Sequence, residues 1–417
     1  MCVHTAEIGV MNRGGSAGRR RGSYESRGMD PARADAPSGS ARSLLPSTPI
    51  GLKRMIRPNG KAIRRVRVLS IPGRRHAQNS YFRLLWDALE KVGLQMIGAR
   101  TTAALTLRYD IFHVHLPELL VERPIHSAAI WGLLFLAYVA LAKATHKKIV
   151  WTIHEVTPTI PRLLTKPFLW CMRRLAGAYV FMNRTSEDEF FRRYPAERQK
   201  AVARIPHSSY PVAKISTDRR RAVRASITDG ADCLVVGFPG EIKPYKNAAA
   251  LRHLPRTDYH GRPLFSIVAG TLHRSCDIAT TEGMFRAMPQ LRRMDQRLTD
   301  EGLSELIQSI DLVFLPYLRG WNSGLAMFAL GCGCRLLCSA LPMFTEIAEK
   351  LGPPWVFVFD HRAADLSQEL TAAVARASQH TPSAADQVRL AQFLAATSFE
   401  QAAVQHLDLY RNLMAGR

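Results

Sequence analysis

Acidic residues are scarce in this sequence. Its 417 residues include 34 Asp and Glu against 57 Lys and Arg, which gives a formal net charge of +23 at pH 7. Residues 1–67 hold 14 of the basic residues and only 4 of the acidic ones, so +10 of the excess lies in the N-terminal sixth. A surplus of this size favours an anionic partner, whether nucleic acid, a phosphorylated substrate or an acidic membrane surface.

Cysteines and long apolar runs are also few. Seven cysteines, an odd number spread over a long chain, do not form a disulfide framework and favour reduced thiols in a cytoplasmic protein. The N-terminus lacks the apolar core of a signal peptide. The longest apolar run, residues 128–142, is shorter than the roughly 20 residues that cross a bilayer. No membrane-spanning helix is therefore predicted.

Sequence signatures of metal sites are missing as well. Cys332, Cys334 and Cys338 lie close together, but they form no Cys-x-x-Cys pair and no histidine is near them in the sequence. This spacing differs from that of zinc ligands, so we predict small buried thiols. No Asp-x-Asp occurs near the loops discussed below, and no metal is predicted.

The remaining composition is that of a globular protein. Apolar residues make up 47% of the chain and charged residues 22%. This length is too great for one hydrophobic core, so two or three domains are expected. Residues 1–60 are rich in Arg, Gly, Ser, Pro and Ala and have few large apolar residues, which predicts a disordered basic tail.

Short β-rich apolar runs alternate with helical segments from residue 66 onward. In the first half, strands are predicted over 66–71, 109–114, 148–153, 178–182 and 203–205, with helices over 81–92 and 125–144. In the second half, strands are predicted over 232–238, 264–269, 311–315, 335–338 and 355–359, with helices over 325–330 and 398–414. Strands buried on both faces and separated by helices predict two doubly wound, Rossmann-like α/β domains in tandem.

The segment 211–230 is polar and basic and is interpreted as a linker between the two series. The predicted organisation then follows from these boundaries. It consists of a tail over 1–60, a first domain over 61–210, the linker, a second domain over 231–395 and a C-terminal helix within 396–417.

Candidate ligand contacts lie just after the strands, because doubly wound sheets bind ligands beyond the carboxyl ends of their strands. Gly240, Lys243 and Lys246 follow the first strand of the second half. A glycine-rich turn lets the backbone approach a ligand, and two lysines three positions apart can neutralise a diphosphate. A solvated loop that happens to hold two lysines is the alternative.

A second such loop follows the strand 311–315. Asn322, Ser323 and Gly324 precede an apolar helix there. Asn or Ser suits an N-cap, and the small Ser-Gly pair leaves amide groups that can face an anion. The pattern predicts a phosphate site, with a capped core helix as the alternative. Both loops are expected at one edge of one sheet.

Histidines and glutamates follow three strands of the first half. His115 and Glu118 follow one strand, His154 and Glu155 the next, and His207 the last. Such groups can act as general bases or bind hydroxyl groups. A lone histidine is more often structural, but three at equivalent strand ends favour one shared cleft.

Taken in order, these segments resemble the GT-B glycosyltransferases that use nucleotide sugars, in particular bacterial members close to family 4. The likeness covers roughly residues 66–415. It rests on an ordered set of motifs: Asn79-Ser80-Tyr81, then residues 109–115, 150–155, 205–207, 240–246, 311–317, 322–330 and 342–346. It implies a first domain that binds the acceptor, a second that binds the nucleotide sugar, and a C-terminal helix that crosses back to the first domain.

The resemblance also implies roles in donor binding. Lys243 and Lys246 would bind the diphosphate, while Asn322, Ser323 and Gly324 would form the helix N-terminal turn that cradles the phosphates.

Two further residues receive roles from the same resemblance. Glu346 falls at a turn that lies near the donor in the family, and His154 at the histidine that meets the donor sugar or the acceptor across the cleft.

One departure concerns two glutamates that the family commonly has eight positions apart around this helix. Trp321 and Ala329 occupy their places here. Loss of the second glutamate removes the usual carboxylate contact to the donor ribose, and it leaves the donor and the stereochemical outcome open. An inverting reaction would need Glu155 or Glu118 as its base, whereas a retaining one would need no such base.

The sequence therefore predicts a glycosyltransferase that moves a sugar from a nucleoside-diphosphate sugar to a glycolipid or polysaccharide, without a cofactor or a metal. The alternatives are a non-catalytic nucleotide- or nucleic-acid-binding protein and a nucleotide-sugar epimerase, although no nucleic-acid-binding signature is present. The basic surface and the apolar segment 125–144, flanked by basic residues 146–148, fit a lipid-linked acceptor at the inner membrane face. A buried crossover helix is the alternative for that segment.

Overall fold

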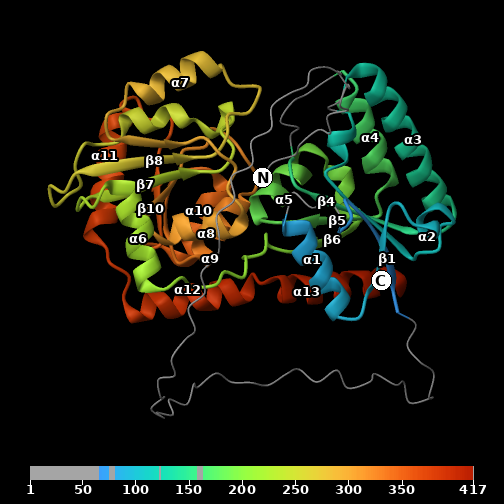
Figure 1. Ribbon diagram of the computed structural model, residues 1–417. Helices are drawn as coiled ribbons and strands as arrows, with labels where there is room; N and C mark the ends of the chain where they lie inside the picture. Colours follow the sequence, from blue (N-terminus) through green and yellow to red (C-terminus); the bar gives the residue numbers. More distant parts are fainter. Residues whose placement is uncertain (1–64, 75–79, 122–123, 157–162, 417) are drawn as a thin grey trace, which may run out of the picture. The chain divides into compact units, whose positions relative to one another are not determined.

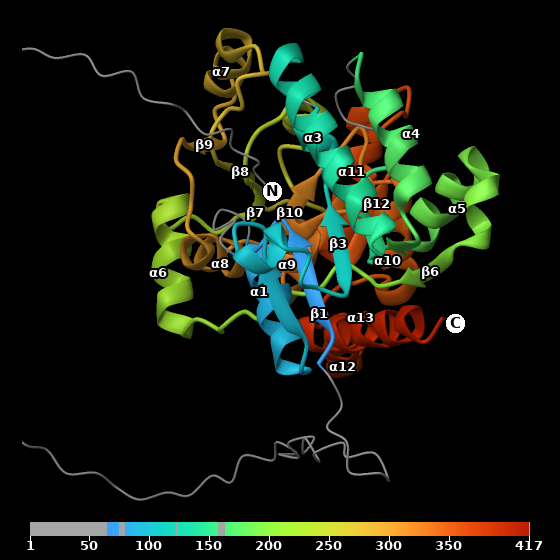
Figure 2. The ribbon, with the colours of Figure 1, turned by 90° about the vertical axis from the view of Figure 1, so that its right-hand side faces the viewer.

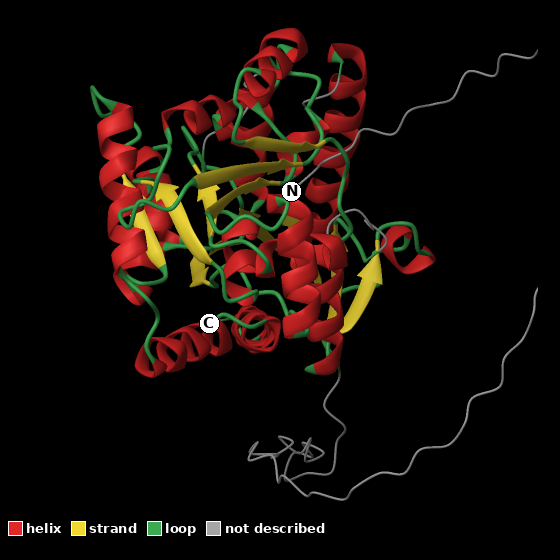
Figure 3. Cartoon of the chain, turned by 60° about the vertical axis from the view of Figure 1, so that its left-hand side comes forward, coloured by secondary structure: helices red, strands yellow, loops and turns green. Residues whose placement is uncertain are grey.

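The computed structural model describes residues 65–74, 80–121, 124–156 and 163–416. The predicted tail over 1–60 and Asn79 lie outside the described residues. The described residues form one compact unit built on two six-stranded sheets, each parallel throughout and flanked by helices (Figures 1 and 3). The predicted fold class, two Rossmann-like α/β domains in tandem, is confirmed.

The first sheet has the strand order β2-β1-β3-β4-β5-β6. Its strands are β1 (Arg67–Ile71), β2 (Gln95–Gly98), β3 (Ile111–His115), β4 (Lys148–Ile153), β5 (Ala178–Phe181) and β6 (Ala201–Arg204). Its helices are α1 (Ser80–Lys91), α2 (Thr102–Leu105), α3 (Ile125–Ala144), α4 (Thr165–Leu175) and α5 (Arg184–Arg193), with 3-10 turns η1 (Pro117–Leu120) and η2 (Pro195–Gln199). The central strands β3 and β5 are buried at every position, as expected for strands covered on both faces.

The second sheet has the order β12-β11-β10-β7-β8-β9. Its strands are β7 (Leu234–Pro239), β8 (Leu264–Ala269), β9 (Leu291–Met294), β10 (Leu312–Leu315), β11 (Arg335–Ser339) and β12 (Val356–Phe359). Its helices are α6 (Thr217–Thr228), α7 (Ile278–Arg286), α8 (Asp300–Gln308), α9 (Gly324–Gly331), α10 (Pro342–Leu351), α11 (Leu366–Gln379) and α12 (Ala384–Ala396), with 3-10 turns η3 (Pro244–Lys246) and η4 (Ala248–His253). The chain reverses its direction across the sheet between β7 and β10, which is where such sheets bind ligands.

Two strands were not anticipated from the sequence. β2 and β9 each lie at the edge of a sheet. Only one of the four residues of β2 is buried, and none of those of β9. An edge strand that is partly open to solvent lacks the continuous apolar run by which the central strands were found.

The segment predicted as a linker contains helix α6. Ser216 caps this helix by accepting a hydrogen bond from the Arg219 amide. Arg224 donates to the carboxylate of Asp311 at 2.7 Å and to the backbone oxygens of Cys233 and Ser309, so the helix is attached to the second sheet. The basic residues of this segment had indicated a linker exposed to solvent, but one of them, Arg224, attaches the helix to the second sheet.

The last helix, α13 (Phe399–Met414), returns to the first half of the chain. It packs against α1 and β6, and Figure 1 shows it running below α1. The Tyr410 hydroxyl lies 2.6 Å from Nδ1 of His113 on β3, and both residues are fully buried. The C-terminal helix therefore closes the core beneath the first sheet.

Helix α3 joins the neighbouring strands β3 and β4 and spans 20 residues, and an 18-residue stretch of it has a mean hydropathy of 1.9. By length and composition alone it could cross a bilayer, in contrast to the shorter run counted in the sequence. Only 22% of this apolar stretch is buried within the protein. One side packs closely on α4, since a Cβ added at Gly132 would lie 3.5 Å from the Phe168 ring.

Removing the Tyr410 hydroxyl should destabilise the protein. In a Tyr410→Phe variant the buried His113 loses a hydrogen-bond partner, which should lower the free energy of unfolding by about 1–3 kcal/mol. Urea unfolding measures this change, with Tyr259→Phe as the control because Tyr259 is 60% exposed. Equal stability of the two variants would contradict a structural role for this hydrogen bond.

Candidate active site

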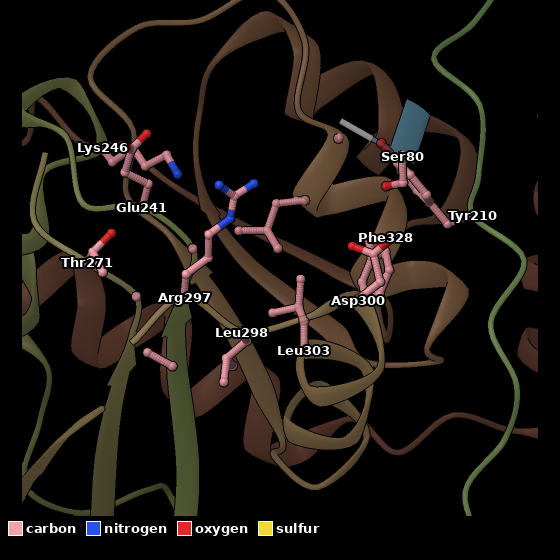
Figure 4. A pocket seen from close by; sticks show the side chains of 15 residues that line it. Ser80, Tyr210, Glu241, Lys246, Thr271, Arg297, Leu298, Asp300, Leu303 and Phe328 are labelled. Carbon is pink, nitrogen blue, oxygen red and sulfur yellow. The ribbon is translucent and has the colours of Figure 1, made fainter. Parts of the chain in front are cut away.

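A cavity opens at the carboxyl ends of β7 and β8, beside the N-terminus of α9 (Figure 4). The strand order of the second sheet reverses between β7 and β10, next to this cavity, where such sheets bind ligands. Most of the lining comes from the second half, and Ser80 and Tyr210 complete it from the first half. The second-half residues are Gly240, Glu241, Lys246, Ala269, Gly270, Thr271, Arg297, Leu298, Asp300, Leu303, Gly324, Leu325 and Phe328.

Two glycines shape the floor of this cavity. Gly240 has φ +93° and Gly270 φ +149°, values that side chains rarely permit. A Cβ at Gly270 would lie 2.1 Å from the Gly240 carbonyl oxygen, so the turns after β7 and β8 pack backbone against backbone. A Cβ at Gly240 would lie 3.5 Å from Nζ of Lys246, which places that ammonium group directly over the turn.

The two predicted lysines are placed differently. Lys246 is buried and lines the cavity, with its Nζ 5.9 Å from the centre of the Tyr317 ring. Lys243 does not line the cavity, and its Nζ lies 3.1 Å from Oε2 of the buried Glu241. The structure therefore brings only Lys246 directly into the cavity.

Arg297 is a second cation in this cavity, and the sequence analysis missed it. It lies in the loop between β9 and α8, and Figure 4 shows its guanidinium and the Lys246 amine pointing into the same part of the cavity. Arg297 follows a strand, as the other candidate residues do, and this position could have identified it. The strand is β9, which the sequence pattern did not reveal, so the loop after it was not predicted as part of a site.

The N-terminus of α9 also faces the cavity through Gly324. Ser323 is its N-cap, and its Oγ accepts a hydrogen bond from the Ala326 amide at 3.2 Å. The first amides of a helix have no partner within it, and the helix dipole is positive at this end. Gly324 therefore lines the cavity, while the Ser323 hydroxyl serves the cap.

Asn322 and Glu346 bond to the first half of the chain. Nδ2 of Asn322 donates to the His154 carbonyl at 2.9 Å, and its Oδ1 accepts from Nδ2 of Asn183 at 3.1 Å. The carboxylate of Glu346 accepts the amide hydrogens of Arg184 and Thr185 at the start of α5, at 3.1 and 2.7 Å. The sequence predicted both side chains near the donor. In the structure they bond to the residues that follow β4 and β5 and so connect the two halves.

A cluster of histidines lies at the carboxyl end of the first sheet. Nδ1 of His115 lies 3.1 Å from Nε2 of His154, and the rings of His115 and His113 have centres 4.2 Å apart. His406 on α13 lies 5.4 Å from His113, between ring centres. His207 packs on Tyr81 instead, with ring centres 4.6 Å apart. Two members were not predicted, His113 because it lies inside a strand and His406 because it lies on a distant helix.

Burial keeps these histidines neutral. It lowers the pKa of His154 to about 3, with a smaller contribution from charge on His207, and lowers the pKa of His207 and His406 to about 4. The pKa of His113 and of His115 also falls well below the usual range, mainly through burial. Nε2 of His207 and of His406 finds no hydrogen-bond partner among the described residues, so a proton there would be buried without an acceptor.

The predicted carboxylates occupy a different place. Glu118, on η1, and Glu155, after β4, line a second, small cavity together with Arg173 of α4 and Tyr194. This cavity shares no lining residue with the one beside Lys246. His154 is closer to the donor side, because its carbonyl bonds to Asn322, two residues before Gly324.

The clustered cysteines are buried, as predicted. Cys332, Cys334 and Cys338 are free thiols, and burial raises the pKa of the first two to about 12. Within the described ranges, no three His, Cys, Asp or Glu side chains are grouped so that they could hold a metal ion.

Known proteins with similar sequences and structures include several glycosyltransferases. No family model matches the chain. The chain is 25% identical over 299 residues to the GDP-mannose:glycolipid 4-beta-D-mannosyltransferase of Xanthomonas campestris, a match that covers 68% of this chain and 76% of that protein. Sucrose-phosphate synthase from Thermosynechococcus elongatus superposes with a TM-score of 0.58 at 17% identity, covering 85% of this chain and 100% of that one. Anabaena HepE, solved in complex with UDP and glucose, gives 0.54 at 13% identity, covering 84% and 99%.

The fold is that of the GT-B glycosyltransferases. The predicted resemblance and the predicted enzyme class, a glycosyltransferase, are both confirmed by these comparisons. The roles of single residues in this GT-B protein stay predictions.

Glu346 should stabilise the junction by accepting the first two amides of α5, a helix whose N-cap residue is Asn183. Glu346→Ala removes the acceptor of two amide hydrogen bonds and should lower the free energy of unfolding by about 1 kcal/mol. The control is Glu349→Ala, since its ion pair with Arg184 at 3.8 Å is largely exposed and should contribute less than about 0.5 kcal/mol. Urea unfolding compares the two variants, and equal losses would argue against a stabilising role of the two Glu346 hydrogen bonds.

The histidine cluster predicts a loss of stability in mild acid. Below pH 6.5 the unfolded chain binds protons at these histidines, while the native state does not. The free energy of unfolding therefore decreases as the pH is lowered, until the pH reaches the native pKa values of about 3 to 4. The slope is about 1.4 kcal/mol per pH unit for each histidine that stays neutral. Urea unfolding from pH 7.5 to 5 measures it, and His406→Leu should make the fall less steep. A stability independent of pH over this range would contradict the neutral cluster.

Proposed function

We propose that this GT-B protein transfers a sugar from a nucleoside-diphosphate sugar, bound in the cavity beside Lys246, to a glycolipid acceptor at the cytoplasmic face of the membrane. The observation that carries the proposal is the convergence of Lys246, Arg297 and the N-terminus of α9 on one cavity. These groups come from three separate loops, at the place where a doubly wound sheet binds its ligand. A pyrophosphate matches them in charge.

The same groups suit the chemistry at the donor. In the transfer, an acceptor hydroxyl oxygen bonds to the anomeric carbon, and the bond from that carbon to the phosphate oxygen breaks with its electrons going to the nucleoside diphosphate. Negative charge therefore grows on the leaving group. Lys246 and Arg297 would offset this charge together with the amides of α9, and their fixed positions favour the transition state over the bound donor.

The acceptor side involves the first half. His154, held by His115 through its ring and by Asn322 through its carbonyl, is suited to hydrogen bonding with a sugar hydroxyl because burial keeps its ring neutral and lowers its pKa. The proton released by the acceptor in an inverting transfer would go to Glu155 or Glu118. These carboxylates lie apart from the donor cavity, so a base role for either one needs the acceptor to extend between the two places.

The names of similar proteins suggest which substrates to test first. The Xanthomonas campestris protein is a GDP-mannose:glycolipid mannosyltransferase, and the Anabaena protein was solved with UDP and glucose. GDP-mannose and UDP-glucose are therefore the first donors for titration. The proposal includes neither a cofactor nor a metal, since the cations of the cavity can take the place of a metal at the diphosphate.

Replacing Lys246 tests the donor site. Lys246→Met should lower kcat/KM for transfer from GDP-mannose or UDP-glucose by about 100-fold or more, because it removes a cation aimed at the leaving group. Arg297→Met should weaken binding of the same nucleotides, measured by calorimetric titration. The matched control is Lys350→Met, an exposed lysine in the last turn of α10.

The outcomes separate this proposal from its rivals. If Lys246→Met transfers sugar as fast as Lys350→Met, the assigned role of Lys246 is wrong. Conversion of the nucleotide sugar without any acceptor would indicate an epimerase. Binding of random DNA in place of either nucleotide sugar would indicate a nucleic-acid-binding protein.

A further inference from the structure

An exposed apolar face runs along α3. Its large apolar side chains are each 51–68% exposed and include Ile125, Ile130, Trp131, Leu133, Leu134 and Leu141. These six residues are termed the α3 face. A helix that is apolar all round is expected inside a protein core or in lipid, and a contiguous apolar patch on a soluble surface marks an interaction site.

The protein itself covers only the other side of the helix. Ala128, Gly132, Val139 and Ala142 are its buried residues, and their spacing of three, four and seven places them on one side. Three of these four residues are alanine or glycine, which lets α3 approach α4 closely, as at Gly132. The large side chains of the α3 face are therefore left for another partner.

The charged side chains on α3 and α4 themselves are all basic. Neither α3 nor α4 contains an acidic residue, while Lys143, Lys166 and Arg174 lie on these helices. The Lys143 ammonium donates to the Arg174 carbonyl at 2.7 Å, and the Arg174 guanidinium lies 5.3 Å from the ring of Trp170, itself 53% exposed. Figures 1 and 2 show α3 and α4 packed side by side, so the basic residues and the apolar face belong to one surface.

We propose that the α3 face docks on an anionic lipid bilayer, with α3 lying in the plane of the interface. Apolar side chains enter the boundary between headgroups and acyl chains while nearby lysines and arginines meet anionic headgroups. A spanning orientation does not fit. α3 is the crossover between β3 and β4, which pair over all five residues of β3, so both of its ends stay attached to one sheet.

This docking rests on the proposed function and adds the place where the acceptor arrives. The turn η1, which carries Glu118, packs against both α3 and α4. Leu169 and Arg173 of α4 line the cavity that holds Glu118 and Glu155. A lipid-linked acceptor would therefore meet these carboxylates close to the docked helices.

Vesicle binding of the full-length protein tests the proposal. Wild type should cosediment with vesicles of phosphatidylglycerol and phosphatidylcholine, and more weakly with phosphatidylcholine alone or at high salt. The triple variant Leu133→Gln, Leu134→Gln and Leu141→Gln should lose at least about tenfold in partitioning, because it removes apolar contact with the lipid. The matched control is Ile278→Gln, Val388→Gln and Val404→Gln, three apolar residues that are 42–56% exposed and lie outside α3.

A second measurement needs no polar variant. Brominated lipids should quench tryptophan fluorescence of the wild type, and replacing Trp131 and Trp170 with Phe should remove most of the quenching.

Several results would overturn the proposal. These are absence of vesicle binding by the wild type, equal binding by the two triple variants, or a wild-type dimer that the α3 substitutions convert to a monomer without vesicles. The last result would show that a second copy covers the face. Calorimetric titration with GDP-mannose and UDP-glucose should give the same affinity for wild type and the α3 variant, so failure of docking is distinguished from failure of the donor site.

Discussion

The side chain of Asn322 bonds to the ends of two strands in the first half, through the His154 carbonyl after β4 and the Asn183 amide before α5. Asn322 also stands two residues before Gly324, whose helix N-terminus lines the cavity. This amide side chain therefore helps to hold the turn before α9 against the histidine expected to meet the sugar. Glu346 adds to the same junction by accepting the first two amides of α5. Transfer between two substrates depends on such positioning, since a small misplacement of reacting groups costs much of the rate.

The histidine cluster continues this junction into the core of the first half. His154 contacts His115, His115 packs on His113, and the His113 ring bonds to Thr152 and to Tyr410 of α13. The terminal helix is thus connected to the carboxyl end of the first sheet through neutral rings, of which His113 and His115 are buried. Because a charge on any of them would be desolvated, the arrangement is most stable where all stay neutral. Neutral rings remain able to donate or accept hydrogen bonds from sugar hydroxyls.

The excess of basic residues has more than one use in this fold. Lys246 and Arg297 line the cavity beside α9, and Arg224 attaches α6 to the second sheet. Lys143 and Arg174 lie on α3 and α4, whose exposed side is apolar. These basic residues differ in their burial and in the groups that they contact. The total charge therefore indicates an anionic binding partner but does not identify that partner. In the proposed enzyme both the diphosphate and the membrane surface are anionic.

The sequence by itself determined the two sheets, because central strands covered on both faces need continuous apolar runs, as in β4 and β8, whose bounds were predicted correctly. It also placed Gly240, Lys246 and Gly324 after strands of one sheet, and these residues do line one cavity. The edge strands β2 and β9 were missed because solvent covers part of them, and Arg297 was missed together with β9. Only the tertiary structure showed that Lys243 pairs with Glu241, that Asn322 and Glu346 bond to the first half, and that His406 joins His113. A local pattern reports burial and turn chemistry, whereas the direction of a side chain depends on contacts with residues far away in the sequence.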